Sequence, residues 1–143
     1  MMRALQWIGV LTFALLVGCA QQPPKDDSLY HALGERPGIQ KIVEGMLLRI
    51  ARDDRIYKYF AKVDIVRVRD KLVEKFCVEA GGPCTYTGDT LEEAHKGLNV
   101  SRGDFNALVE NLIEAMDDQH IPVPTQNRFI ARLAPQRGEV IEK

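Results

Sequence analysis

The chain has 143 residues, of which 45% are hydrophobic and 27% charged, with 19 basic and 20 acidic side chains. This length predicts one domain with a single core and excludes a large enzyme with several sites. The balanced charge also argues against general binding to nucleic acid, which needs a basic surface.

The first 18 residues are predicted to be a signal peptide. They carry one charge, Arg3, followed by an apolar run over residues 4–17. This run is shorter than the roughly 20 apolar residues that a transmembrane helix needs. Without residues 1–18 the chain has 18 basic against 20 acidic side chains, a net charge of about −2.

Residues 16–19, with the sequence LVGC, resemble the lipobox of bacterial lipoproteins. That resemblance implies diacylation of Cys19 and a tether over residues 19–27, so that lipid chains anchor the protein to a membrane. Ala20 rather than Asp follows the cysteine, which implies the outer membrane, facing the periplasm. The alternative is plain secretion, with a cysteine at this position by coincidence.

From Ser28 onward the apolar residues recur at helical spacing. Ser28 is expected to cap a short helix that ends at Gly34. Residues 38–52 then form a helix, and a polar link at 53–55 leads to a short aromatic turn at 56–60. The apolar stripe of the helix contains Ile39, Ile42, Val43, Met46, Leu47 and Ile50.

The next helix is predicted to begin at Asp64 and to end at a glycine-proline turn, residues 81–83. Its expected inward side chains are Ile65, Val68, Leu72, Val73 and Phe76. Cys77 and Cys84 stand on either side of the turn. In an oxidising compartment they either form a disulfide or remain separate, with Cys77 buried as a small apolar residue.

After an irregular stretch at residues 84–88, a short helix is predicted around residues 90–96. Ser101 and Asp104 have the spacing of a capping box, with Asp in place of the usual Glu or Gln, and open a long helix. Residues 121–124 break that helix, and a final helix runs from about residue 125 to 134 and on past Pro135. No segment alternates at period two, so residues 28–143 are predicted to be one all-α domain.

Two short motifs make this domain more specific than a helical bundle. Residues 81–88, with the sequence GGPCTYTG, precede residues 94–98, with the sequence AHKGL. In this order they resemble the group 1 truncated globins, which are small two-over-two helical haem proteins. Agreement extends to Ser28-Leu29-Tyr30, Pro37-Gly38-Ile39, Tyr59-Phe60, Val63-Asp64, Phe76 and Asp104-Phe105.

The resemblance implies haem b as the cofactor and His95 as the proximal ligand of its iron, because a neutral imidazole is a strong axial donor. Phe60 is expected to pack on the haem face, and Tyr86 and Lys96 to reach a propionate or a neighbouring backbone group. His31 and His120 are expected at the surface. The remaining residues expected to line the cavity are Phe76, Leu91, Val100 and Phe105.

The sequence departs from the family on the distal side of the expected haem. Met46-Leu47 replaces the usual Phe-Tyr, and Leu72 replaces a glutamine, with Val68 one turn earlier. Leu47, Val68 and Leu72 are therefore predicted to form an apolar distal wall. Without about 1 to 3 kcal/mol of hydrogen bonding, bound oxygen should leave about one to two orders of magnitude faster than in relatives with donors.

Lys71 occupies a position from which some family members supply a second axial ligand. Only its neutral amine can bind iron. Lys71 is therefore predicted either to be a sixth ligand or to reach outward to a propionate with its charge intact.

The resulting expectation is an envelope globin that reversibly binds O₂, CO or NO. A nitric oxide dioxygenase activity would need an external reductase. One alternative is a six-coordinate haem protein for electron transfer or redox sensing. Another is an interaction lipoprotein that keeps the globin fold without haem.

Overall fold

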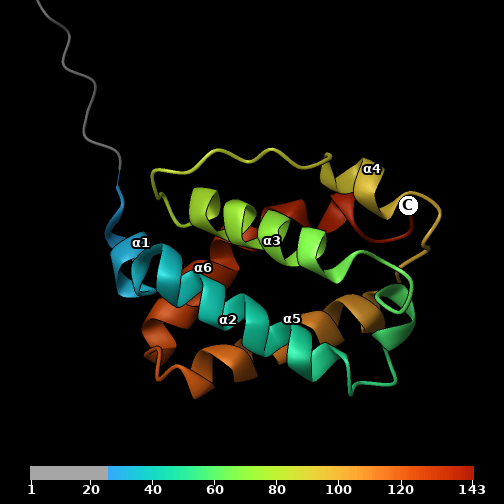
Figure 1. Cartoon of the computed structure of the whole chain (residues 1–143), viewed down its shortest axis with the longest axis horizontal. Helices are drawn as coiled ribbons and strands as arrows, with labels where there is room; N and C mark the ends of the chain where they lie inside the picture. Colours follow the sequence, from blue (N-terminus) through green and yellow to red (C-terminus); the bar gives the residue numbers. More distant parts are fainter. Residues whose placement is uncertain (1–25) are drawn as a thin grey trace, which may run out of the picture.

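The computed structural model describes residues 26–143, which form six α-helices and two short 3₁₀ helices (Figure 1). The predicted signal peptide, Cys19 and most of the tether lie outside these residues. No helix of the described part is long and apolar enough to cross a membrane. The elements are α1 (Ser28–Ala32), α2 (Glu35–Ile50), η1 (Tyr57–Tyr59), α3 (Ile65–Glu79), α4 (Leu91–His95), α5 (Arg102–Asp118), α6 (Val123–Leu133) and η2 (Ala134–Glu139).

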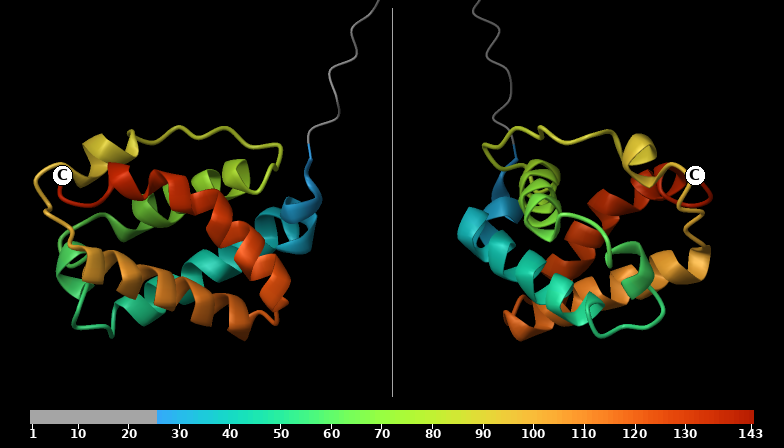
Figure 2. Two further views of the ribbon diagram at one scale, coloured as in Figure 1. Left: turned by 180° about the vertical axis from the view of Figure 1, so that it is seen from behind. Right: turned by 45° about the vertical axis from the view of Figure 1, so that its right-hand side comes forward.

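Four helices build the body of the fold. Helix α2 packs along both α3 and α5, and α6 closes the arrangement by contacting α3 and α5 from behind (Figure 2). One pair of helices thus lies over the other, which confirms the predicted all-α, two-over-two architecture. The core between the pairs includes Ile39, Ile42, Val43, Met46, Ile50, Val73, Phe76, Leu112, Met116 and Phe129, all of them buried.

The start of α2 differs from the prediction by one turn. The helix begins at Glu35 rather than at residue 38, directly after Gly34, whose φ of 81° reverses the chain. Pro37 lies in the first turn, where its missing N–H has no partner to lose. Ser28 does not cap α1 but lies inside it, and its backbone N–H and hydroxyl donate to the Asp26 carboxylate at 3.1 and 2.6 Å.

Helix α3 begins where the sequence predicts. The Asp64 side chain accepts hydrogen bonds from the backbone N–H groups of Val66 and Arg67, both at 3.1 Å. The prediction that Ile65 faces inward is wrong, because its side chain is 46% exposed. The apolar stripe of α3 starts one turn before the helix reaches the core, so only the later members of the stripe are covered.

The second half of the chain follows the predicted caps. Ser101 and Asp104 form the capping box of α5. Helix α6 begins at Val123, two residues early, because Pro124 is compatible with the first helical turn. It continues past Pro135 as η2, as expected.

The last residues of the chain return to the segment that follows α4 (Figures 1 and 2). The Lys143 carbonyl accepts hydrogen bonds from the backbone N–H groups of Gly97 and Asn99, at 2.9 and 3.1 Å. Val100 and Ile141 form an isolated β-bridge. The C-terminus therefore holds the chain that leaves α4.

Candidate functional site

A cavity of about 520 Å³ lies between α3, α4 and α5 and is lined mainly by apolar side chains. Ten of the twelve residues predicted to contact the cofactor line it: Phe60, Val68, Lys71, Leu72, Phe76, Tyr86, Leu91, His95, Val100 and Phe105. These residues are spread over 46 positions of the sequence, and the fold brings them around one space. Such a volume and lining are typical of a site for a cofactor or a small ligand.

The other two predicted residues lie elsewhere. Leu47 does not line the cavity, whereas its neighbour Met46 does. A step of one residue rotates a side chain by about 100° around a helix, so Leu47 packs instead against the edge of the core. Lys96 is exposed just after the last residue of α4, where the backbone becomes extended.

Helix α4 presents His95 at its C-terminal end. The helix has only five residues, and a complete capping box opens it: the Thr90 hydroxyl accepts from the Glu93 N–H at 3.2 Å, and the Glu93 carboxylate accepts from the Thr90 N–H at 3.2 Å. This arrangement satisfies free N–H groups of a helix that is too short to be stable alone.

The His95 ring is oriented by a backbone carbonyl. Its Nδ1 atom lies 2.7 Å from the Leu91 oxygen. A carbonyl oxygen only accepts, so Nδ1 must carry the hydrogen and Nε2 keeps its lone pair. Histidines that bind a metal through one ring nitrogen commonly donate the N–H of the other to a carbonyl or carboxylate, which orients the ring. By contrast, His31 is exposed between two carboxylates, and His120 is exposed.

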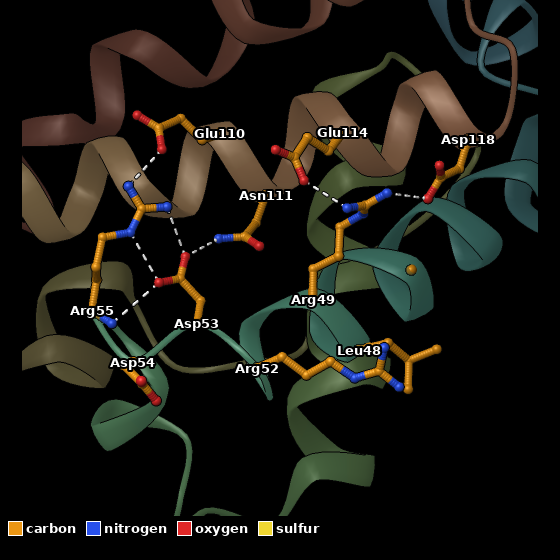
Figure 3. A pocket seen from close by; sticks show the side chains of 11 residues that line it. Leu48, Arg49, Arg52, Asp53, Asp54, Arg55, Glu110, Asn111, Glu114 and Asp118 are labelled. Atoms are coloured by element: carbon orange, nitrogen blue, oxygen red, sulfur yellow. Dashed lines mark hydrogen bonds and ion pairs between the residues drawn. The ribbon is translucent and has the colours of Figure 1, made fainter.

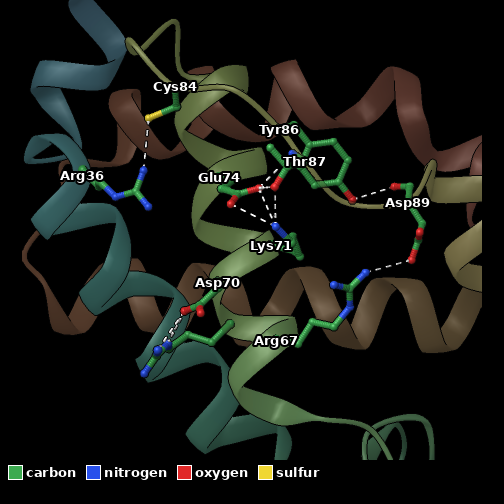
Figure 4. Close-up of polar contacts among 10 residues, drawn as sticks. Arg36, Arg67, Asp70, Lys71, Glu74, Cys84, Tyr86, Thr87 and Asp89 are labelled. Carbon is green, nitrogen blue, oxygen red and sulfur yellow. Dashed lines mark hydrogen bonds and ion pairs between the residues drawn. The ribbon is translucent and has the colours of Figure 1, made fainter.

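The segment between α3 and α4 is attached to α3 at two points, of which Figure 4 shows the second, between Thr87 and Glu74. Cys77 of α3 and Cys84 of the segment form a disulfide, with Cα atoms 5.9 Å apart, which decides between the two alternatives that the sequence left open. Three residues further, the Thr87 backbone N–H and hydroxyl both donate to the Glu74 carboxylate at 2.9 Å. The hydrogen bond from the Thr87 N–H is the main cause of the lowered pKa of Glu74.

Lys71 and Tyr86 line the cavity, but their polar ends already have protein partners (Figure 4). The Lys71 ammonium donates to both carboxylate oxygens of Glu74, at 3.1 and 3.2 Å, and to the Thr87 hydroxyl. The Tyr86 hydroxyl donates to the backbone oxygen of Asp89 at 2.7 Å. Of the two contacts predicted for Tyr86, the structure contains the one with a neighbouring backbone group.

The sequence did not indicate Tyr59 and Asp104 as residues of this cavity. The Tyr59 hydroxyl donates to the Asp104 carboxylate at 2.8 Å, and burial raises the pKa of Tyr59. Hydrogen bonds from Ser101 lower the pKa of Asp104 to about 2. Asp104 therefore has two partners, because it completes the capping box with Ser101 and also accepts the hydrogen bond from Tyr59, 45 residues away in the sequence.

Further lining residues could not be assigned from periodicity, since helices, turns and the C-terminal segment all contribute. They are Met46, Ile56, Val63, Asp64, Arg67, Lys75, Asp89, Ala94, Leu98, Leu108, Val109, Leu112, Leu133, Gln136 and Val140. Two of them matter for charge, because Arg67 and Lys75 flank Lys71 at intervals of one helical turn, and these three side chains together are called the cationic edge.

A second hollow, of about 630 Å³, lies between α2, α5 and the turn after α2 (Figure 3). Six of its charged groups pair with one another: Arg49 with Glu114 and Asp118, and Arg55 with Asp53 and Glu110, at 2.6 to 2.8 Å. Asn111 also donates to Asp53 at 2.7 Å. These mutual pairs join α2 to α5 and make the hollow a structural contact between helices.

The apolar cavity fits the predicted haem. Phenylalanine, leucine and valine side chains suit the porphyrin, His95 offers an imidazole nitrogen with a lone pair, and the cationic edge suits the propionates. On this arrangement His95 would hold the iron from one side, while α3 would cover the other.

Comparison with protein families matches residues 28–142 to the bacterial-like globin model. The chain is 30% identical over 120 residues to the group 1 truncated hemoglobin GlbN of Synechocystis sp., covering 81% of this chain and 94% of that protein. It is 26% identical over 113 residues to GlbN of Mycolicibacterium paratuberculosis, covering 79% of this chain and 83% of that protein.

Solved structures show the same fold. The truncated hemoglobin of Tetrahymena pyriformis in the Fe(III) form superposes with a TM-score of 0.78 at 23% identity, covering 80% of this chain and 98% of that one. The 2/2 hemoglobin of Synechococcus sp. PCC 7002, a cyanomet form with covalently attached heme, gives a TM-score of 0.74 at 18% identity, covering 79% and 97%.

Proposed function

This chain belongs to the bacterial-like globin family, among the group 1 truncated hemoglobins, and we propose that it binds haem b through His95 and reversibly binds a diatomic gas at the iron. The observation that carries this proposal is the His95 imidazole in the apolar cavity, with its Nδ1–H donated to the Leu91 carbonyl. That bond leaves Nε2 as the ring atom that would bind the iron.

When bound, haem supplies an iron with a coordination position at which O₂, CO or NO can bind. The residues of this chain then decide which gas is held. His95 would hold the iron from the α4 side, and Met46, Val68 and Leu72 would line the opposite side with apolar side chains. The Tyr59 hydroxyl, a donor within the cavity, is already engaged by Asp104.

An apolar ligand side favours fast release of oxygen. Bound O₂ carries partial negative charge on its outer atom and is stabilised by hydrogen-bond donors, whereas CO needs them less. Loss of such donors should speed oxygen release by about one to two orders of magnitude. The protein is thus better suited to rapid exchange of gas than to tight storage of oxygen.

Catalytic removal of nitric oxide is a secondary role within this proposal. It would require a reductase partner to return the iron to the ferrous state, and the apolar wall of Met46, Val68 and Leu72 offers no hydrogen-bond donor to the bound oxygen that this reaction uses. The gas-binding role needs no such partner.

The six-coordinate alternative rests on Lys71, which lines the cavity. Its ammonium already has the Glu74 carboxylate and the Thr87 hydroxyl as partners. This geometry favours an iron with an open position for gas over an iron closed by lysine.

We also propose that the protein is a lipoprotein of the outer membrane, facing the periplasm, with Cys19 as the lipidated residue. The support is the sequence of residues 1–20. Labelling cells with a radioactive fatty acid should label the wild type and not Cys19→Ser. Equal labelling of both would reject the lipid anchor.

Absorption spectra test the gas-binding proposal directly. The wild type and Lys71→Ala should show a Soret band, a ferric spectrum without a lysine ligand, and a ferrous CO complex, whereas His95→Ala should lose the spectrum of a histidine-bound iron. If the wild type shows no Soret band after haem is added, the haem-free interaction lipoprotein becomes the better explanation.

A further inference from the structure

One carboxylate connects the two sides of the cavity. Glu74, on α3, accepts two hydrogen bonds from Thr87, at 2.9 Å each, and contacts the Lys71 ammonium through both oxygens (Figure 4). Thr87 belongs to the segment that leads to α4 and His95, whereas Lys71 lies on α3. The side chains of Glu74 and Lys71 are only 17% and 24% exposed, so water screens this pair incompletely.

The contacts restrict Lys71 in particular. Its Nζ atom donates hydrogen bonds to the carboxylate of Glu74, one turn further along α3, and to the Thr87 hydroxyl. To bind an iron atom in the cavity, Nζ would have to leave both partners and transfer a proton to solvent, so that its lone pair could form the new bond. Breaking the Lys71–Glu74 pair costs free energy, because both side chains are partly buried and the Glu74 carboxylate would lose its cationic partner.

We infer that Glu74 is a positioning residue for the haem site: it keeps Lys71 away from the iron and holds the Thr87 segment against α3. The inference rests on the proposed haem function, since it explains how a chain with a lysine beside the cavity keeps a coordination position open for gas. The carboxylate acts through Lys71 and Thr87 and does not itself line the cavity.

The same helix offers a matched control. Lys75 also lines the cavity, and it pairs with Glu79 at 2.8 Å, with side chains that are 20% and 19% exposed. Among the described contacts, Glu79 has no bond to the segment at residues 84–90. Both Glu74→Ala and Glu79→Ala remove a carboxylate from α3 and introduce a residue of high helix propensity, but only the first releases Thr87 and Lys71.

The first experiment compares haem-loaded full chains at one fixed pH. Glu74→Ala is expected to show a ferric low-spin fraction and azide binding at least about tenfold slower than in the wild type, because Lys71 competes for the iron. Glu79→Ala should behave like the wild type, and Lys71→Ala/Glu74→Ala should return to an open, high-spin iron. A Glu74→Ala spectrum and azide rate equal to those of Glu79→Ala would overturn the inference.

The second experiment uses the chain without haem. Limited proteolysis within residues 84–90 should be at least about fivefold faster in Glu74→Ala than in the wild type or Glu79→Ala. Equal cleavage rates would also overturn the inference. If no variant takes up haem, the proposed function fails, while the cleavage rates still report whether Glu74 holds this segment.

Discussion

The two sides of the cavity are built by different means. The α3 side consists of residues 46–76, which lie on long helices or on the turn between them and pack through Met46, Val68, Leu72 and Phe76. The His95 side, residues 81–100, contains one five-residue helix and otherwise irregular chain. Individual polar and covalent ties hold it in place: the disulfide, the bonds from Thr87 to Glu74, the capping box and the Lys143 carbonyl.

This difference shows where precision in the site comes from. Long helices form their own backbone hydrogen bonds and are stabilised by burial of apolar area, so many residues each contribute a small part of the stability. A five-residue helix has almost no stability of its own, so each hydrogen bond or covalent bond to the rest of the fold contributes a large part of the free energy that holds it in place. Substitutions that remove the hydrogen-bonded ties of the His95 side should therefore act locally on haem retention. The disulfide also constrains the unfolded chain, so its loss should lower global stability, and substitutions on the α3 side should change ligand chemistry or global stability.

The largest effect is expected for His95→Ala, because it removes the proposed iron ligand. Loss of the group that accepts a hydrogen bond from a metal-binding histidine typically costs about 10- to 100-fold in metal affinity. Loss of the histidine itself should therefore speed haem transfer to an acceptor protein by more than about 100-fold. His31→Ala, which changes an exposed histidine, serves as the control. Equal transfer rates for both variants would exclude His95 as the ligand.

Removal of the disulfide should be next in size. A cross-link that closes so short a loop is expected to contribute about 2 to 3 kcal/mol to the free energy of unfolding. Cys77→Ala/Cys84→Ala should lose that amount in urea denaturation and become insensitive to dithiothreitol, whereas reductant should destabilise the wild type. A wild type that is unaffected by reductant would contradict a stabilising role.

Leu72→Gln probes the α3 side. A donor added beside the bound gas should slow oxygen dissociation by about 10- to 100-fold, corresponding to about 1 to 3 kcal/mol. Stopped-flow measurement of oxygen release gives the rate, with Leu72→Met as the apolar control. Unchanged release in Leu72→Gln would mean that oxygen does not contact this part of the wall.

The two capping boxes permit a direct comparison of the sides. Thr90→Ala on α4 and Ser101→Ala on α5 should each cost about 1 kcal/mol. Thr90→Ala should mainly speed haem loss, by about fivefold, and Ser101→Ala should mainly lower the global free energy of unfolding. If both variants change only global stability, the claim that the His95 side affects haem retention locally is wrong.

The smallest effect concerns acid stability and Asp104. Hydrogen bonds from Ser101 and then from Tyr59 lower its pKa from 3.8 to about 2, so the ionised carboxylate stabilises the fold. That contribution is complete above about pH 4 and is lost as the pH falls toward 2. Asp104→Asn should show a shallower decline in unfolding free energy over this range, as measured by urea titration. Tyr59→Phe, which removes one donor, should lie between the two.

Much of the framework was predictable because it depends on local chemistry. Apolar spacing predicted α2, α3, α5 and α6, and the Ser101 box predicted the start of α5. The error at Leu47 has a different cause, which is the rotation of α2 relative to the cavity. Leu47 was assigned to the cavity in place of Met46, because a resemblance aligns positions without specifying the rotation of a helix.

The contacts that hold the His95 side could not be predicted in the same way. Glu74 and Thr87 are 13 residues apart, and nothing in either neighbourhood distinguishes them from exposed polar residues. The partnership of Tyr59 with Asp104, 45 residues apart, is of the same kind.

Helix positions, the caps Asp64 and Ser101 and the glycine-proline turn can thus be read from the chain, since each depends on residues within one or two helical turns. The candidate ligand His95 follows from the resemblance of residues 81–98 to the truncated globins. Three features depend instead on how the helices rotate and pack. Ten separated side chains line one cavity, the Lys71 ammonium donates to Glu74, and Met46 rather than Leu47 faces the cavity. Packing is decided by the whole core at once, and a local pattern of residues does not contain it.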